Sequence, residues 1–160
     1  MQKKYLFIGI ILIISLFLIA CLPTGEIDPT DCPRLEGTAQ DQCFFEKNEC
    51  SQISDDTVRE LCVVELAKVA NDLQVCDLIT DEAIKGNCQT QIAKLQNDNS
   101  ICTQITSQYW INNCYDAYAR ANNNADFCNK IQDITQQIEC YYDVAIESEN
   151  YETCFEIDNS

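Results

Sequence analysis

The stretch from Cys76 to Cys102, CDLITDEAIKGNCQTQIAKLQNDNSIC, contains one complete unit of a repeat, and this repeat decides the fold. Cysteines recur every 26 residues in two series, at positions 50, 76, 102, 128 and 154 and at positions 62, 88, 114 and 140. Self-similarity at such a period is typical of a stacked array of supersecondary units. We therefore expect a row of similar small units rather than one irregular globule.

Each unit carries the pattern of two helices. Apolar residues recur every four positions around the second cysteine, as in Ile84, Cys88 and Ile92, which is one face of an amphipathic helix. Asn97-Asp98 ends this run, and Thr80-Asp81 precedes it, where the hydroxyl can cap the helix and the acid favours the positive end of its dipole. The predicted fold class is all-α: an array of α/α helix hairpins, each with a long helix of about 15 residues and a short one of about 7.

The cysteines are expected to form disulfides that staple these hairpins. Twelve cysteines in 160 residues approach the level of a secreted disulfide scaffold. The chain has no histidine and no C-x-x-C pair, which zinc and redox sites commonly use. Cysteines 12 residues apart would lie about 18 Å apart on one helix, whereas a disulfide joins Cα atoms within about 7 Å, so the chain must reverse between bonded neighbours.

Two pairing schemes compete. The favoured one matches the arm lengths around the turn near Thr80 and leaves Cys154 free; it pairs Cys32–Cys43, Cys50–Cys62, Cys76–Cys88, Cys102–Cys114 and Cys128–Cys140. The rival scheme bridges the 14-residue gaps instead, pairing Cys62–Cys76, Cys88–Cys102, Cys114–Cys128 and Cys140–Cys154. The end units are degenerate under either scheme, as expected because terminal repeats must face solvent.

The N-terminus has the layout of an export signal. Lys3 and Lys4 precede an apolar run from Tyr5 to Ala20. Leu18-Ile19-Ala20-Cys21 then resembles the lipobox of prokaryotic membrane lipoproteins, which implies cleavage before Cys21 and lipidation of its thiol. The resemblance implies a signal peptide at 1–20, a lipidated cysteine and tether at 21–30, and anchoring on the extracytoplasmic face of the cell membrane. An uncleaved transmembrane anchor is the alternative, because the 18 residues from Tyr5 to Leu22 just suffice for a span.

Residues 31–160 form the predicted cysteine-rich α/α repeat domain, which resembles disulfide-stapled tandem helical-repeat proteins of cell envelopes. This resemblance is architectural and implies no particular ligand. Acidic residues number 26 against 10 basic ones, for a net charge of −16 that becomes −18 without the signal peptide. Such a surface repels nucleic acid, so none is expected as a partner.

Enzyme motifs are lacking. There is no histidine to act as a base and no G-x-S-x-G elbow, and only Gly37 and Gly86 lie in the repeat domain, too few for a phosphate-binding loop. Carboxylate chemistry stays open, since 26 acids make chance pairs inevitable. Asp-rich turns such as Asp55-Asp56 are interpreted as helix caps rather than as calcium sites. We expect no catalytic residues, no cofactor and no metal site.

Two sets of side chains are candidates for binding. Lys68, Lys94 and Arg120 share one repeat position, so stacking would align them along a face, where salt bridges to the acidic surface are the simpler explanation. Tyr109, Tyr141 and Tyr142 are candidate surface contacts, with core or rim packing as the alternative.

The sequence therefore favours a lipid-anchored, non-enzymatic binding or scaffold module whose repeat surface contacts a protein or polymer partner. Metal sequestration by thiols or carboxylates is the second hypothesis, and an enzyme with carboxylate chemistry is the third. The oligomeric state is left open.

Overall fold

A computed structural model describes residues 31–150 and Glu152, and within them it is a row of helices without a β-strand. The α-helices are α2 (Thr38–Glu46), α3 (Asp56–Ala70), α4 (Glu82–Gln96), α5 (Gln108–Ala121) and α6 (Ile134–Glu147). Each follows a 3₁₀ helix: η1 (Cys32–Arg34), η2 (Cys50–Gln52), η3 (Leu73–Leu78), η4 (Asn99–Gln104) and η5 (Ala125–Lys130). The predicted signal peptide, Cys21, the tether and Cys154 lie outside the described residues.

The short element of each unit is a 3₁₀ helix, which corrects the expected helix of about seven residues. Asp72, Asp98 or Asn124 caps its first turn in the later units, and an extended isoleucine ends it after three or six residues. So short a segment has little room for α-helical bonding, and 3₁₀ geometry suits short pieces.

The caps of the long helices also differ from expectation in one respect. Asp55, Asp81 and Asp133 cap α3, α4 and α6 through their carboxylates, whereas the neighbouring hydroxyls of Ser54 and Thr80 bond elsewhere. Carboxylates suit this place because the first turn presents free N–H groups and the positive end of the helix dipole. The described α-helices end in a left-handed turn, with positive φ at Asn48, Asn71, Asn97, Asn123 and Glu149.

Five disulfides fasten each 3₁₀ helix to the α-helix that follows it, with Cα atoms 5.4 to 5.8 Å apart. The bonds are those of the favoured scheme: Cys32–Cys43, Cys50–Cys62, Cys76–Cys88, Cys102–Cys114 and Cys128–Cys140. Most of these cysteines have no exposed surface, and together with the isoleucines that end the 3₁₀ helices they form a continuous core along the row. A single unit has little apolar surface to bury, so the staple and the neighbouring unit together hold it.

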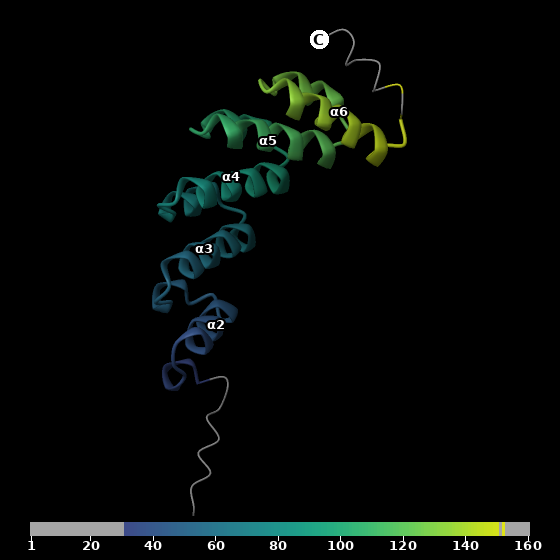
Figure 1. The fold of residues 1–160 in the computed structure, drawn as a ribbon. Coiled ribbons are helices and arrows are strands. Elements are labelled where there is room, and N and C mark those ends of the chain that lie inside the picture. Colours follow the sequence, from purple (N-terminus) through teal and green to yellow (C-terminus); the bar gives the residue numbers. More distant parts are fainter. Residues whose placement is uncertain (1–30, 151, 153–160) are drawn as a thin grey trace, which may run out of the picture.

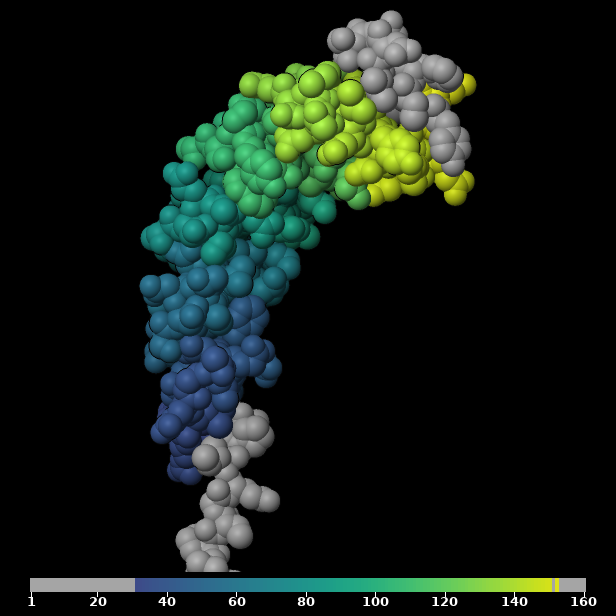
Figure 2. All heavy atoms as spheres, in the orientation of Figure 1, coloured from purple at the N-terminus to yellow at the C-terminus, as the bar shows by residue number. Residues whose placement is uncertain are grey.

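The units stack in chain order, and each α-helix packs against the next one. The stack curves from α2 at one end to α6 at the other, as Figure 1 shows for the ribbon and Figure 2 for the surface. None of the helices that the structure describes is long and apolar enough to cross a membrane.

Candidate functional site

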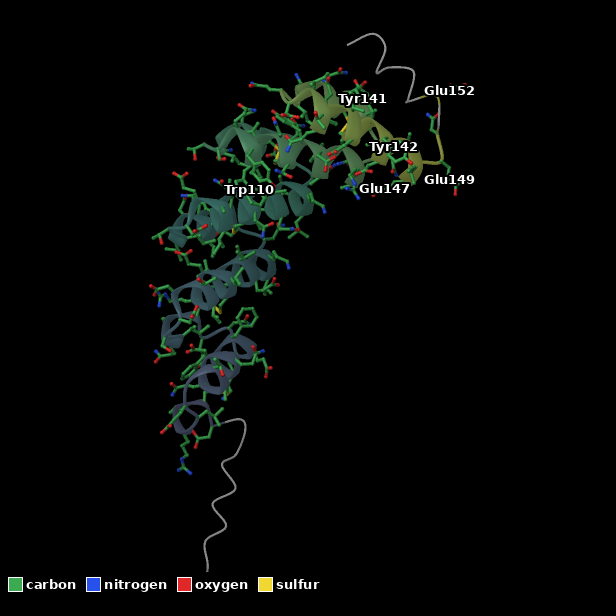
Figure 3. All side chains as sticks on the ribbon, in the orientation of Figure 1. Trp110, Tyr141, Tyr142, Glu147, Glu149 and Glu152 are labelled. Carbon is green, nitrogen blue, oxygen red and sulfur yellow. A yellow bond between two sulfur atoms is a disulfide. The ribbon has the colours of Figure 1, made fainter. Side chains whose placement is uncertain are left out.

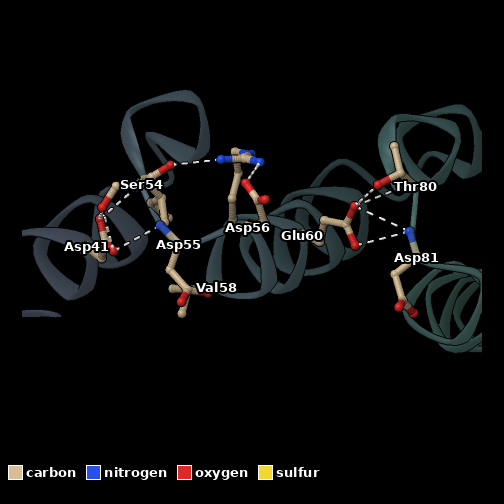
Figure 4. Close-up of polar contacts among 10 residues, drawn as sticks. Asp41, Ser54, Asp55, Asp56, Val58, Glu60, Thr80 and Asp81 are labelled. Atoms are coloured by element: carbon tan, nitrogen blue, oxygen red, sulfur yellow. Dashed lines mark hydrogen bonds and ion pairs between the residues drawn. The ribbon is translucent and has the colours of Figure 1, made fainter.

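One repeat position joins successive units at three of its five occurrences, and we call it the clamp position: the residue two before the second cysteine of each unit. It is occupied by Asp41, Glu60, Gly86, Asn112 and Ile138. The Asp41 carboxylate accepts hydrogen bonds from the Ser54 N–H at 2.8 Å and from the Ser54 hydroxyl. Glu60 likewise accepts from the N–H and hydroxyl of Thr80 and from the Asp81 N–H (Figure 4). Each carboxylate therefore ties its helix to the loop that begins the next one.

These hydrogen bonds favour the charged carboxylates. The pKa of Asp41 lies below its ordinary value, mainly because the Ser54 N–H donates to it. The pKa of Glu60 is lowered mainly by the Thr80 hydroxyl, with help from the Thr80 N–H. Asn112 does the same work without charge, because its Oδ1 accepts from the Gln132 N–H at 3.2 Å. Sequence reasoning missed these roles, although an acid two residues before the cysteine recurs in two units.

Of the three cations that share one repeat position, two are paired with acidic side chains of the same protein. Lys68 pairs with Glu65 one turn earlier on α3, at 2.8 Å. Arg120 bridges α5 to α6 through Asp143 at 3.0 Å and Glu147 at 2.6 Å. Lys94 is exposed and pairs with no acid that the structure describes. Two of the three cations thus make the salt bridges that were the simpler explanation, and only Lys94 stays available.

Arg120 sits among three carboxylates. The Glu147 hydrogen bond is the main cause that raises the pKa of the guanidinium. Asp116 lies 3.9 Å from Arg120 on the same helix, yet burial raises the pKa of its carboxyl above the ordinary value. The group is thus a structural junction between α5 and α6, in which the cation is paired within the protein.

The three tyrosines have different places. Tyr109 and Tyr142 are exposed, with Tyr109 packed edge-on against Trp110 at 5.4 Å. Tyr141 is only 1 % exposed, and its hydroxyl donates to Asn129 of η5 at 2.7 Å. The prediction of Tyr141 as a surface contact is therefore wrong, because its place beside Cys140 on α6 turns it toward the 3₁₀ helix of its own unit (Figure 3).

A strip of apolar side chains on α6 is exposed, and we call it the α6 face: Ile134, Ile138, Tyr142 and Ile146, which are 58 %, 41 %, 59 % and 48 % exposed. Their spacing of four places them along one side of the helix. The same repeat positions on α5 are polar, namely Gln108, Asn112, Asp116 and Arg120, and two of them bond directly to α6. The α6 face is therefore the surface that the following helix covers on earlier units. Sequence reasoning found Tyr142 but missed the three isoleucines, although their spacing of four was visible.

Within residues 31–150 and Glu152, no three histidine, cysteine or acidic side chains are grouped so that they could hold a metal ion. The ten described cysteines of the second hypothesis are in disulfides and offer no thiolate. Comparisons of the chain with models of known protein families, with curated proteins and with solved structures found no match.

Proposed function

We propose that this protein is a lipid-anchored, extracytoplasmic scaffold that binds a protein partner through the α6 face and has no catalytic activity of its own. The observation that carries the proposal is the chemistry of that face. No helix that the structure describes covers this face, and a repeat surface that faces solvent is normally polar. The α6 face is instead apolar where the covered helix α5 is polar. A contiguous exposed apolar strip is typical of an interaction surface.

The charges around the strip favour a basic partner. Glu139 and Glu149 lie on or just after α6 and form no ion pair with the described residues, whereas Asp143 and Glu147 are paired with Arg120. A partner helix with an apolar stripe flanked by lysine or arginine would complement this surface, as helix-in-groove recognition requires. A second copy of this chain carries the same excess of acids, as does its own C-terminal segment YETCFEIDNS. Repulsion between like charges argues against both as occupants.

The proposed location rests on the resemblance of residues 18–21 to a lipobox and is supported by the cysteines. Disulfides persist in oxidising compartments, and all ten cysteines that the structure describes are bonded in five pairs. The α6 end of the stack lies opposite the end that follows the predicted tether (Figure 1). An anchored array would thus hold the α6 face away from the membrane. Two acyl chains on Cys21 would give stable attachment.

Photo-crosslinking in cells of the source organism tests the binding. A photoreactive phenylalanine analogue replaces Tyr142, and we expect a crosslink to another protein through a helix rich in lysine or arginine. Ile138→Asp should abolish this crosslink, whereas Thr135→Asp, which adds the same charge at an exposed site of α6, should preserve it. A crosslink only to a second copy, only to residues 151–160, or to nothing would refute the proposal.

The anchor is tested separately. Cys21→Ser should leave the precursor uncleaved and unlabelled by fatty acid. Normal processing of that variant would refute lipidation at Cys21 without touching the assignment of the α6 face.

A further inference from the structure

A recess of about 390 Å³ lies between the beginning of α4 and the loop that leads into α5. Lys85, Gly86 and Gln89 line it from α4, and Thr106 and Ser107 line it from the loop. Its volume lies near the lower end for pockets that bind small molecules. The recess shares no residue with the α6 face, so a ligand bound in it would be independent of the proposed partner.

The loop at this recess lacks the acceptor that its counterparts have. The clamp position here is Gly86, which has no side chain, whereas Asp41, Glu60 and Asn112 supply an oxygen to the equivalent loops. The N–H groups of Thr106 and Ser107 consequently find no acceptor among the described residues. Ser107 also forms no side-chain cap on α5, although an aspartate caps α3, α4 and α6. This loop therefore lacks both the clamp oxygen and the capping carboxylate that its counterparts have.

Packing explains the glycine. A Cβ at residue 86 would come within 2.4 Å of Cγ of Trp110, a distance that real side chains do not tolerate. Trp110 lies at the boundary of α4 and α5 (Figure 3). A smaller residue, Ile84, stands at its repeat position one unit earlier, where Glu60 is present. The indole thus excludes an internal carboxylate, while the recess beside Gly86 stays open.

A buried amide points into the same recess. Gln89 is only 8 % exposed and lines the recess, yet its side chain bonds to none of the described residues. The same repeat position is Val63, Tyr115 or Tyr141 in other units, where the side chain packs in the core. None of the buried side-chain polar atoms that the structure describes lacks a partner, so the unbonded amide tip of Gln89 reaches solvent within the recess. The amide is therefore free to bind a polar ligand there.

The charges of the lining narrow the class of ligand. Lys85 supplies the cation and pairs with Asp77 at 2.8 Å, and Glu82 adds a second carboxylate. A ligand with only a negative charge would meet an excess of acid. A ligand that also carries an ammonium group would balance it. In the recess one unit earlier, the Glu60 carboxylate already occupies the N–H groups of Thr80 and Asp81.

We propose that the recess binds a small zwitterion, an amino acid or a dipeptide. Its carboxylate accepts hydrogen bonds from the Thr106 and Ser107 N–H groups and from the Gln89 amide, in the place that Glu60 takes one unit earlier. Its ammonium group faces Asp77 and Glu82. Hydrogen bonds between an ionised carboxylate and N–H groups are the stronger kind, which favours this end as the anchor.

Titration of the oxidised full-length chain in detergent micelles tests the assignment. Trp110 is the only tryptophan and packs on Gly86, so its fluorescence reports on the recess. Alanyl-alanine should bind at millimolar concentration and change the emission. The C-terminal amide of alanyl-alanine should bind more weakly by a factor of about ten or more, as expected for loss of a charge-assisted hydrogen bond. Equal binding of the amide, or no binding of the dipeptide, would overturn the proposal. N-acetyl-alanyl-alanine binding as tightly as the dipeptide would overturn the role of the ammonium group.

Two variants connect the binding to the recess. Gln89→Val installs the residue of the preceding unit and should weaken alanyl-alanine about tenfold. Ser107→Pro removes one of the two N–H groups and suits the φ of −82° at this residue, so it should retain the helical circular dichroism signal and weaken binding about tenfold. Lys94→Met, at the far end of α4, should bind as the parent chain does. Unchanged affinity in the folded Ser107→Pro variant would show that the ligand sits elsewhere.

Discussion

Removing one internal disulfide should destabilise the array severely. The bond Cys76–Cys88 closes a loop with a sequence separation of 12. The chain-entropy model gives about 2.8 kcal/mol for a loop of this size. Neither cysteine has exposed surface, so replacing both with alanine also deletes two buried sulfur atoms, at roughly 1 kcal/mol each. We therefore expect Cys76→Ala/Cys88→Ala to lose about 5 kcal/mol.

Applied to all five loops, the entropy term alone reaches about 14 kcal/mol. That is near the top of the range of about 5–15 kcal/mol for the whole stability of a domain. Full reduction should consequently leave no stable array, and the far-UV helical signal should collapse under reductant at room temperature.

Urea unfolding followed by circular dichroism measures both effects. Cys154→Ser is the matched control, because it changes a cysteine that belongs to none of the five bonds, and its unfolding midpoint should stay unchanged. The reasoning fails if the Cys76/Cys88 variant loses less than about 1 kcal/mol, or if reduction shifts the melting temperature by only about a degree.

Three further perturbations test other parts of the structure. Glu149→Asn should stabilise the end of α6 by about 0.5–1 kcal/mol, because Glu149 has a φ of +53° where equivalent turns use asparagine; calorimetry would detect it, and a loss would contradict it. Arg120→Met should destabilise the α5–α6 junction by about 1 kcal/mol, whereas Lys94→Met at the same repeat position should be neutral in urea unfolding; equal effects would refute the bridging role. Because the pKa values of Asp41 and Glu60 are lowered in the folded state, the stability that these carboxylates contribute is present at neutral pH and is lost as the pH falls through the folded-state pKa. Glu60→Gln should therefore flatten the acid side of a curve of unfolding free energy against pH. An unchanged curve would exclude a contribution of Glu60 to stability.

The repeat made the unit and its staple predictable. Cysteine spacing and turn residues led to the pairing Cys76–Cys88, because the chain can reverse only where it is capped. The boundaries of α4 followed from Asp81 and Asn97 at its ends. The nature of the short helix was less accessible, because a segment of six residues has too weak a periodicity to separate 3₁₀ from α-helix.

Contacts between units were harder to predict than contacts within them. Glu60 and Thr80 are 20 residues apart, and nothing in their local sequence distinguishes a clamp from a solvated acid. Tyr141 and Tyr142 are adjacent aromatic residues, yet Tyr141 is buried and Tyr142 is exposed. To predict this difference, one must know which side of α6 faces the core and that no described helix covers the other side.

Departures from the repeat, more than the repeat itself, locate the two candidate sites. Taken alone, Gly86 is an ordinary glycine in a helix. Aligned by repeat position with Asp41, Glu60 and Asn112, which each supply an oxygen to the next loop, it marks a missing acceptor. Ile138 occupies the same clamp position on α6, where it can supply no oxygen and is exposed. Loss of the polar side chain thus has opposite results at the two junctions. Inside the array, where Trp110 fills the adjoining space, it leaves polar N–H groups that suit a small carboxylate. At the α6 end it extends an apolar strip that suits another helix.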